Sequence, residues 1–397
     1  MPSWSPLSSD ARLWAPSADG LALYVHWPFC VSKCPYCDFN SHVRDSVDQE
    51  AWRNALLADL AYEAALLPDR KLSSIFFGGG TPSLMPPATV AALIDAASKH
   101  WAMSDDIEIT LEANPSSVEA ARFADLAAAG VNRVSLGIQA LDNETLAYLG
   151  RAHDVTEGLS ALDTAQVAFD RVSFDLIYAR PEQNEQDWAA ELTRALSFGT
   201  EHLSLYQLTI EPGTQFAARF AKGELATLDS DRAATLFEQT RQQMREAGLP
   251  AYEISNHARP GAESRHNLTY WHYGTYAGVG PGAHGRRGGL ATARRKKPEN
   301  WLGRVADNGH GIESEELLAP QARAEEALLM GLRLDRGVDL AAIARESRLG
   351  VGGIVDAGAI DRLSGHGLLI RKGDHLTVTE TGMLLLDAIL AEIVQTG

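Results

Sequence analysis

Strand-like and helix-like segments alternate between Leu21 and Thr209, and this alternation restricts the possible fold more than any other feature. Repeated β-α units with right-handed crossovers predict a parallel sheet that curves into a partial (β/α)6 barrel of the α/β class. Runs rich in β-branched, aromatic or leucine residues predict six strands, at Leu21–Trp27, Ser73–Phe77, Asp106–Leu111, Arg133–Ile138, Arg171–Ile177 and His202–Thr209. Helical spacing lies between them, at Asp48–Leu67, Pro87–His100, Ser117–Ala129, Asp154–Phe169 and Glu185–Phe198.

The pattern changes after about Ser314 and predicts a second, smaller domain. Helical stretches at Glu325–Leu334, Asp339–Glu346 and Ile354–Leu363 precede a hairpin at Leu368–Val378 and a last amphipathic helix. This order is typical of a winged-helix-like domain. The expected organisation is an N-terminal extension (1–20), a core barrel (21–250), a connecting segment (251–312) and a C-terminal domain (313–397).

The three cysteines of the chain, Cys30, Cys34 and Cys37, lie in one loop after the first predicted strand. Their odd number and short spacing argue against a disulfide framework, so reduced thiols are expected. A closed zinc site would need a fourth ligand, and chance or buried cysteines usually scatter along a chain. Iron–sulfur clusters prefer thiolates, and a C-x3-C-x2-C set with three of them leaves one iron open for a substrate or cofactor.

Polar residues follow all six predicted strands, at the positions where each strand ends. The carboxyl ends of parallel strands meet at one rim of a barrel, where sites form. Taken singly, each residue has a plain explanation as a turn, a helix cap or a surface residue, but their coincidence at one rim favours a binding site. The segments are the cysteine loop, Gly78–Pro82, Glu112, Gln139, Asp175 and Tyr206–Gln207.

The cysteine spacing and this rim resemble the radical S-adenosylmethionine (SAM) superfamily. In that superfamily SAM chelates the open iron of a [4Fe–4S] cluster, and an electron from the cluster splits the sulfonium to give a 5′-deoxyadenosyl radical. The resemblance implies a radical SAM barrel with Cys30, Cys34 and Cys37 as cluster ligands. The SAM-binding residues that it implies are Tyr24, Tyr36, Gly79, Gly80, Thr81, Glu112, Gln139, Arg151 and Asp175.

Within that superfamily, several segments are similar to the HemN/HemW group. They are Tyr24–His42, G-G-G-T-P-S-L, L-E-A-N-P, G-V-N-R-V-S-L-G-I-Q, L-G-R-A-H and Y-Q-L-T-I-E-P-G-T. Oxygen-independent coproporphyrinogen III oxidase (HemN) has a further cysteine two places after the third, where this chain has Phe39. Cys37–His42 instead resembles HemW, which is regarded as a haem chaperone.

This resemblance implies a carrier that binds a [4Fe–4S] cluster, SAM and haem, and delivers haem to an acceptor haemoprotein such as a respiratory one. The alternative is an enzyme that decarboxylates the propionates of coproporphyrinogen III. A third possibility, a cluster-based redox sensor, has no specific sequence feature in its favour. Whether SAM is consumed, and so whether the protein is an enzyme, stays open at this point.

An H-N-x-x-Y-W stretch follows the predicted barrel and matches a feature that the HemW family associates with haem binding. The haem-binding residues that it implies are His266, Asn267 and Tyr270. One helical turn would place His266 and Tyr270 on one face, and imidazole and phenolate are both known haem ligands. The neighbouring Trp271, Tyr273 and Tyr276 add flat apolar surface. The alternative is that His266 and Tyr270 only pack or form hydrogen bonds.

The formal net charge of −17, from 35 Lys and Arg against 52 Asp and Glu, disfavours nucleic acid as a partner. Residues 1–20 lack the basic start and apolar core of a secretory signal. No apolar run approaches the roughly 20 residues that a membrane span needs. A cytoplasmic protein with at most peripheral membrane contact is therefore expected.

Two further segments need an interpretation. A basic cluster at Arg286, Arg287 and Arg294–Lys297 could meet haem propionates or an anionic membrane, but an exposed, solvated hairpin is favoured. The glycine-rich Gly278–Gly285 lacks the lysine and the strand-to-helix placement of a phosphate loop. Finally, Asp175–Gln183 reads D-L-I-Y-A-R-P-E-Q where the resembling family has D-L-I-Y-G-L-P-G-Q, so Arg180 adds charge beside the rim and leaves loop geometry and substrate access open.

Overall fold

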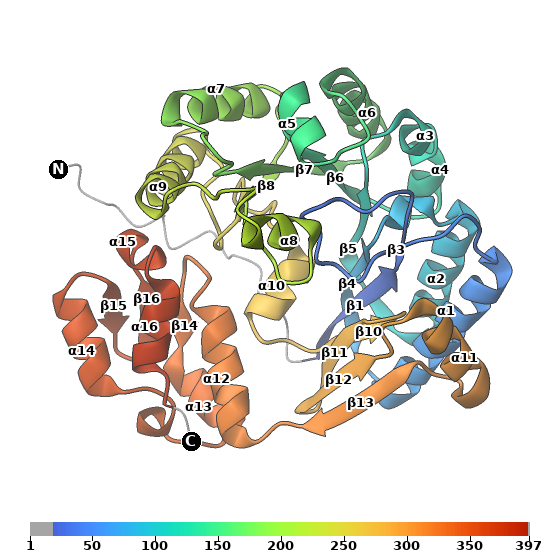
Figure 1. Ribbon diagram of the computed structural model, residues 1–397. Helices are drawn as coiled ribbons and strands as arrows, with labels where there is room; N and C mark the ends of the chain where they lie inside the picture. Colours follow the sequence, from blue (N-terminus) through green and yellow to red (C-terminus); the bar gives the residue numbers. More distant parts are fainter. Residues whose placement is uncertain (1–18, 396–397) are drawn as a thin grey trace.

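The computed structural model describes residues 19–395, in which one large curved sheet is wrapped by helices and joined to a smaller C-terminal domain (Figure 1). Only the last two positions of the expected extension at 1–20 fall within the described residues. The six expected strands are all present, and neighbouring ones pair in parallel in chain order. They are β1 (Gly20–Trp27), β4 (Lys71–Gly79), β5 (Ala102–Ala113), β6 (Arg133–Gln139), β7 (Arg171–Tyr178) and β8 (His202–Gln207).

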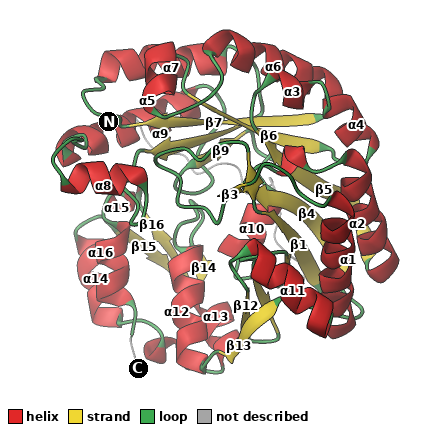
Figure 2. Cartoon of the chain, turned by 45° about the vertical axis from the view of Figure 1, so that its right-hand side comes forward, coloured by secondary structure: helices red, strands yellow, loops and turns green. Residues whose placement is uncertain are grey.

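Helices cover the outer face of this sheet (Figure 2). Most of them begin at a side chain that accepts a backbone N–H; Asp48, Asp154 and Asn184 are examples. The helix expected at Ser117–Ala129 is instead two short helices, α3 and α4. The helices up to residue 246 are α1 (Gln49–Leu66), α2 (Pro87–His100), α3 (Ser117–Ala120), α4 (Phe123–Ala128), α5 (Asn143–Tyr148), α6 (Val155–Ala168), α7 (Glu185–Leu196), α8 (Gln215–Ala221) and α9 (Ser230–Glu246), with a 3-10 turn at Pro82–Leu84.

The sheet continues beyond the six expected strands at both edges. On one side β10 pairs in parallel with β1 and is followed by three antiparallel strands, and on the other side β9 pairs antiparallel with β8. Residues 256–258 and 276–294 of the expected connecting segment therefore belong to the main sheet, and so do residues 313–317 of the expected C-terminal domain. The added elements are β9 (Asn256–Ala258), α10 (Arg265–Trp271), β10 (Tyr276–Val279), β11 (His284–Arg287), β12 (Leu290–Arg294), α11 (Pro298–Asn308) and β13 (Ile312–Leu317).

Buried ion pairs hold this extension against α1. Arg294 places Nε 2.6 Å from Asp59 Oδ2 and Nη2 2.9 Å from Glu63 Oε1. Arg287 Nε lies 3.3 Å from Glu63 Oε2. The prediction of an exposed basic hairpin is therefore wrong for Arg287 and Arg294, because carboxylates more than 220 positions earlier in the chain neutralise both side chains as they become buried.

The C-terminal domain has its own apolar core, to which α9 contributes Phe237. The expected helices and hairpin are present, and the sheet order is β14-β16-β15. The elements are α12 (Pro320–Gly331), β14 (Val338–Asp339), α13 (Leu340–Ser347), a 3-10 turn (Val351–Gly353), α14 (Ala357–Gly365), β15 (Leu369–Lys372), β16 (His375–Val378), α15 (Glu380–Met383) and α16 (Leu386–Ile393).

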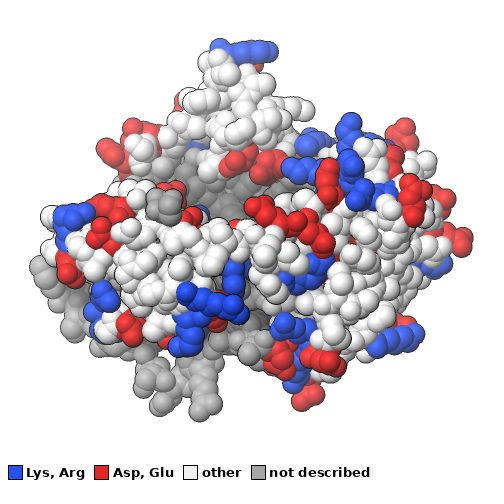
Figure 3. Space-filling model, turned by 90° about the horizontal axis from the view of Figure 1, so that it is seen from below, with Lys and Arg blue, Asp and Glu red and all other residues white. Residues whose placement is uncertain are grey.

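The charge distribution of the surface and the length of the helices are relevant to nucleic acid and membranes as possible partners. Basic and acidic side chains are interspersed over the face seen from below in Figure 3, where neither sign forms one broad patch. Within residues 19–395, no helix is both long and apolar enough to cross a membrane.

Candidate functional site

Cys30 ends β2 (Phe29–Cys30), and Cys34 and Cys37 lie in the loop that leads to β3 (His42–Val43); β2 and β3 are a pair of two-residue parallel strands. All three thiols are partly exposed. Each sulfur has one polar side chain near it: Thr81 Oγ1 donates to Cys30 at 3.4 Å, Arg151 Nη1 donates to Cys34 at 3.4 Å, and Ser41 Oγ lies 3.9 Å from Cys37. Donors of this kind stabilise thiolates and tune the potential of iron–sulfur clusters.

Three cysteine thiols close together in the chain are the kind of donor that an iron–sulfur cluster takes. In residues 19–395, no three His, Cys, Asp or Glu side chains come together closely enough to hold a metal ion. Burial raises the pKa of Cys30 and Cys37, so binding has to displace protons from these thiols.

The end of β4 and the loop after it bring backbone against β1 and the cysteine loop, and only glycine fits there. Gly79 has φ +117°, and a Cβ on it would lie 2.6 Å from the His26 ring. A Cβ on Gly80 would lie 2.8 Å from the carbonyl oxygen of Phe29 and 3.0 Å from Cys30 Sγ. The glycines of this loop therefore allow the close approach that the sequence pattern predicts.

A hydrogen-bonded chain links the cysteine loop to the rim. Arg151 Nη2 donates to Asn114 Oδ1 and to the carbonyl of Gly137, both at 2.8 Å. Asn114 Nδ2 in turn donates to Thr81 Oγ1 at 3.0 Å, and Thr81 and Arg151 donate to two of the cysteines. Burial raises the pKa of Tyr36, which interacts with Arg151. Sequence reasoning did not single out Asn114, whose signals are its position just after β5 and its place in the L-E-A-N-P segment.

Two carboxyl groups at the rim, those of Glu112 and Asp175, are half-buried. Glu112 Oε2 accepts from the backbone N–H of Gly79 at 3.2 Å, and Asp175 Oδ1 accepts from Ser135 Oγ at 3.3 Å. Burial, and then the nearby Asp175, raise the pKa of Glu112 to about 8. Burial also raises the pKa of Asp175 to about 6. Glu112 is therefore mostly protonated at neutral pH and can donate as well as accept. Gln139 ends β6 in the left-handed region, with φ 71°.

A cavity of about 420 Å³ opens between this rim and α10. Its size suits a small-molecule ligand. Three predicted SAM residues and one predicted haem residue share it, together with side chains that sequence reasoning did not single out. The lining residues are Tyr24, His26, Phe39, Asn40, Gly79, Glu112, Tyr270, Trp271, Tyr276, Gly282, His284, Arg286 and Met330.

The H-N-x-x-Y-W stretch forms α10, which packs against β1 and β4. His266 is buried and both of its ring nitrogens are engaged: Nδ1 lies 3.1 Å from Ser74 Oγ and Nε2 lies 2.6 Å from Tyr270 Oη. Burial lowers the pKa of His266 to about 3, so its imidazole is neutral. Asn267 is half-buried, and its backbone N–H donates to Ser264 Oγ. This geometry is that of the alternative in which His266 and Tyr270 pack and form hydrogen bonds. Their roles as haem ligands stay predictions.

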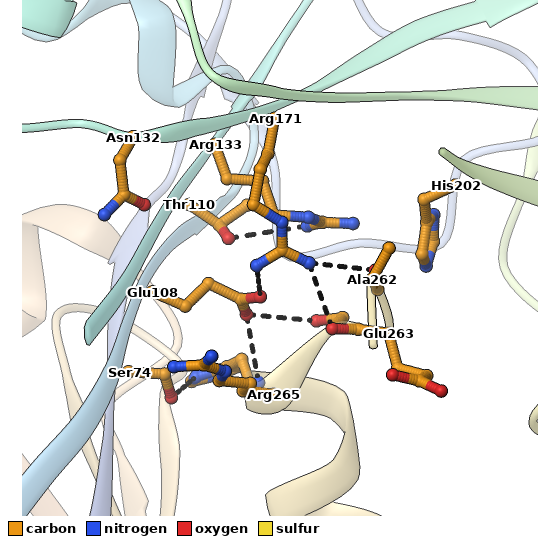
Figure 4. A network of polar contacts seen from close by, with 12 residues as sticks. Ser74, Glu108, Thr110, Asn132, Arg133, Arg171, His202, Ala262, Glu263 and Arg265 are labelled. Atoms are coloured by element: carbon orange, nitrogen blue, oxygen red, sulfur yellow. Dashed lines mark hydrogen bonds and ion pairs between the residues drawn. The ribbon is translucent and has the colours of Figure 1, made fainter. Parts of the chain in front are cut away.

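A charged network that the sequence did not reveal lies beneath α10 (Figure 4). The buried carboxylate of Glu108 accepts from Arg171 Nη1 at 2.7 Å and from the backbone N–H of His266 at 3.2 Å. Arg133 is buried beside it and donates to Thr110 Oγ1. This network ties the first turn of α10 to β5 and β7.

Comparison with known proteins places these features in a family. Residues 24–195 match the Radical SAM superfamily model, and residues 318–385 match the HemN C-terminal domain. "Radical S-adenosyl methionine domain-containing protein 1, mitochondrial" of Mus musculus is 40% identical over 380 residues, which cover 93% of this chain and 86% of that protein. "Heme chaperone HemW" of Escherichia coli is 36% identical, over 93% of this chain and 97% of its own length. The chain belongs to the HemW family of radical SAM proteins.

A solved structure agrees with the fold of this HemW-family chain. Coproporphyrinogen III oxidase (HemN) from Escherichia coli superposes with a TM-score of 0.78 over 96% of this chain and 91% of that one, at 22% identity. The predicted radical SAM barrel followed by a HemN-type C-terminal domain is thereby confirmed.

The departure at 179–182 places two non-glycine residues in left-handed backbone in the loop after β7 of this HemW-family chain. Ala179 and Glu182 both adopt left-handed backbone, with φ of 55° and 63°, at the two positions where the family pattern has glycine. Arg180 Nη2 lies 2.5 Å from Glu191 Oε2 of α7, and both side chains are largely buried. Arg180 thus points to the helix layer and does not line the central cavity.

Proposed function

We propose that this protein is a haem chaperone that binds a [4Fe–4S] cluster, SAM and haem, and passes haem to an acceptor haemoprotein. One observation carries the proposal: a single cavity is lined by predicted SAM residues, such as Gly79 and Glu112, and by the Tyr270 and Trp271 end of α10. Relatives named "Heme chaperone HemW" that are 36% identical over 93% of the chain support it. Phe39, which also lines the cavity, stands where coproporphyrinogen oxidase has its additional cysteine.

At the rim, the proposed roles follow from the hydrogen bonds. Cys30, Cys34 and Cys37 would hold the cluster, which when bound supplies an electron-transfer centre with one iron open to SAM. Thr81 and Arg151 would stabilise the thiolate ligands through their donors at 3.4 Å. The backbone around Gly79 and Gly80 would accept the methionine end of SAM, and Glu112 and Asp175 its hydroxyl groups.

At α10, Tyr270, Trp271 and Tyr276 would supply a flat aromatic surface for the porphyrin. His266 would be the stronger ligand for the haem iron because its imidazole is already neutral, but its Nε2 must first leave the Tyr270 hydroxyl, 2.6 Å away. Burial raises the pKa of Tyr270 well above its usual value, so ligation by a phenolate would require iron to displace the proton. We propose a cytoplasmic location, although the murine relative carries "mitochondrial" in its name.

Anaerobic reconstitution followed by haem titration tests the proposal. We expect stoichiometric haem uptake in the absorbance spectrum, and no decarboxylation when coproporphyrinogen III, SAM and a reductant are supplied. His266→Ala and Tyr270→Ala should weaken uptake or change the spectrum, whereas Tyr62→Ala, on the outer helix α1, should not. Formation of protoporphyrinogen would instead support the oxidase, and absence of haem uptake by the intact protein would exclude the carrier.

A further inference from the structure

The arginines of the basic cluster have different surroundings. Arg287 and Arg294 are buried against Glu63 and other carboxylates. Arg295 is half-exposed and pairs with Glu313 at 3.2 Å. Of the Lys and Arg residues in 19–395, only Arg286 lines the central cavity.

Arg286 is largely buried, with 11% of its side chain exposed, and part of its hydrogen-bonding capacity is unused. Its guanidinium carbon lies 3.6 Å from the centroid of the Tyr273 ring and 5.4 Å from that of Tyr276, so the group is stacked on aromatic faces. Its nearest carboxylate is Glu326, at 3.5 Å from Nη2, which is longer than the roughly 2.7–2.9 Å of a charge-assisted hydrogen bond. Nη1 is buried and has no hydrogen-bond partner among the residues that the structure describes.

The other groups around Arg286 leave it incompletely neutralised. Glu326 also accepts from the Tyr273 hydroxyl at 2.6 Å, so its charge is shared. Glu112 lies in the same cavity but is mostly protonated at neutral pH. Aromatic side chains and Met330 form much of the remaining wall. The cavity therefore combines a flat apolar surface with one guanidinium that still has a free N–H group.

We propose that Arg286 binds a carboxylate of the ligand in the central cavity, namely a propionate of haem. A guanidinium matches a carboxylate in shape and charge, and a buried cation gains most from such a partner. This inference depends on the proposed haem-carrier function. The carboxylate of SAM is the competing source of the same chemistry, but the Cys30–Cys37 loop, where SAM is expected, has Arg151 as its own cation.

The test compares haem with haem dimethyl ester, in which both propionates have lost their charge. Both are titrated into the reconstituted protein, into Arg286→Gln and into the matched control Arg295→Gln, and affinity is read from absorbance. Intact protein should bind haem roughly ten- to a hundredfold more tightly than the ester. Arg286→Gln should lose that preference because its affinity for haem falls while its affinity for the ester does not, and Arg295→Gln should keep the preference.

The outcomes separate the two proposals. Equal affinity of the intact protein for haem and ester, or unchanged haem affinity in Arg286→Gln, overturns the role of Arg286 and leaves the carrier function standing. Binding of neither ligand by the intact protein overturns the carrier function itself. Loss of SAM binding without loss of haem binding in Arg286→Gln, measured by calorimetry, would assign the guanidinium to SAM. If Arg286→Gln does not fold, equal affinity of the intact protein for haem and ester still overturns the role of Arg286.

Discussion

Replacing Glu108 by glutamine keeps the shape of the side chain but removes the negative charge beneath α10 (Figure 4). The carboxylate has no exposed surface and accepts from Arg171 Nη1 at 2.7 Å, from Ser264 Oγ at 3.4 Å and from the backbone N–H of His266 at 3.2 Å. Burial alone would raise the pKa of Glu108, but Arg133, Arg171 and backbone N–H groups together lower it below its usual value. The carboxylate is therefore charged in the folded protein.

The size of the effect follows from the partners that glutamine would leave behind. Removing one member of a buried ion pair costs about 3–5 kcal/mol because the other charge stays buried without compensation. Arg133 is 3% exposed, whereas the Arg171 side chain is 25% exposed, so water relieves only part of the loss. With about 2.1 cal/mol/K of unfolding entropy per residue, this corresponds to a fall in Tm of about 4–6 °C.

The pH dependence has a definite sign. A lowered folded-state pKa means that Glu108 contributes its full stabilisation above the unfolded-state pKa of about 4.3. That contribution is lost as the pH falls through the folded-state pKa. The difference in Tm between the intact protein and Glu108→Gln should thus be full at pH 7 and shrink below about pH 4.

Differential scanning calorimetry at both pH values checks this, with Glu313→Gln as the control. Glu313 forms a half-exposed pair with Arg295, so its loss should change the free energy of unfolding by no more than about 1 kcal/mol. A drop in Tm for Glu108→Gln no larger than that for Glu313→Gln would refute the reasoning. Such a small drop in Tm is what a solvated network beneath α10 would give, in place of a buried one.

Three further predictions concern the rim. Gly79→Ala should lower Tm and abolish SAM binding in calorimetry, because Gly79 has φ +117° and a Cβ on it would lie 2.6 Å from the His26 ring. The control Gly303→Ala, which has open space around it, should do neither. Thr81→Val removes a hydrogen-bond donor to Cys30 and should therefore make the reduction potential of the cluster more negative by roughly 20–60 mV. An EPR redox titration measures this, and an unchanged potential would contradict it. Glu112→Gln should have a higher Tm than the intact protein, and the difference should grow between about pH 4.3 and about pH 8. The reason is that a carboxyl group with a raised folded-state pKa destabilises the fold as the pH rises. A difference in Tm that stays constant with pH would refute this prediction.

The barrel was predictable from sequence because its signals are local. Each of the six parallel strands contains a run rich in β-branched, aromatic or leucine residues, and each intervening helix has its own spacing, so the alternation alone defines the order. The extension of the sheet was not predictable in this way. β10 is a four-residue strand beside a glycine-rich turn, and its partner β1 lies some 250 positions earlier in the chain. The pairing of Arg294 with Asp59 is equally remote, which is why the basic cluster was interpreted as exposed.

The candidate site was predictable to the extent that its residues lie at strand ends. The cysteine loop, Gly79 and Glu112 come together because parallel strands carry their carboxyl ends to one rim. Asn114 and His26 were missed because their roles depend on contacts: Asn114 bridges Thr81 and Arg151, and the His26 ring lies between Tyr24 and the backbone of Asn40. The H-N-x-x-Y-W stretch indicated a site, but its burial inside the sheet could not be inferred from spacing.

The position of α10 has a thermodynamic consequence for the two proposed ligands. Tyr24, Gly79 and Glu112 on one side and Tyr270 and Trp271 on the other line the same cavity of about 420 Å³, so a ligand against α10 would lie next to one bound at the rim. Neighbours in so small a space must alter each other's contacts, by steric competition or by mutual burial. Linkage then requires the factor by which SAM changes the affinity for haem to equal the factor by which haem changes the affinity for SAM. A carrier built in this way would be controlled by SAM binding itself, without any need for SAM to be cleaved.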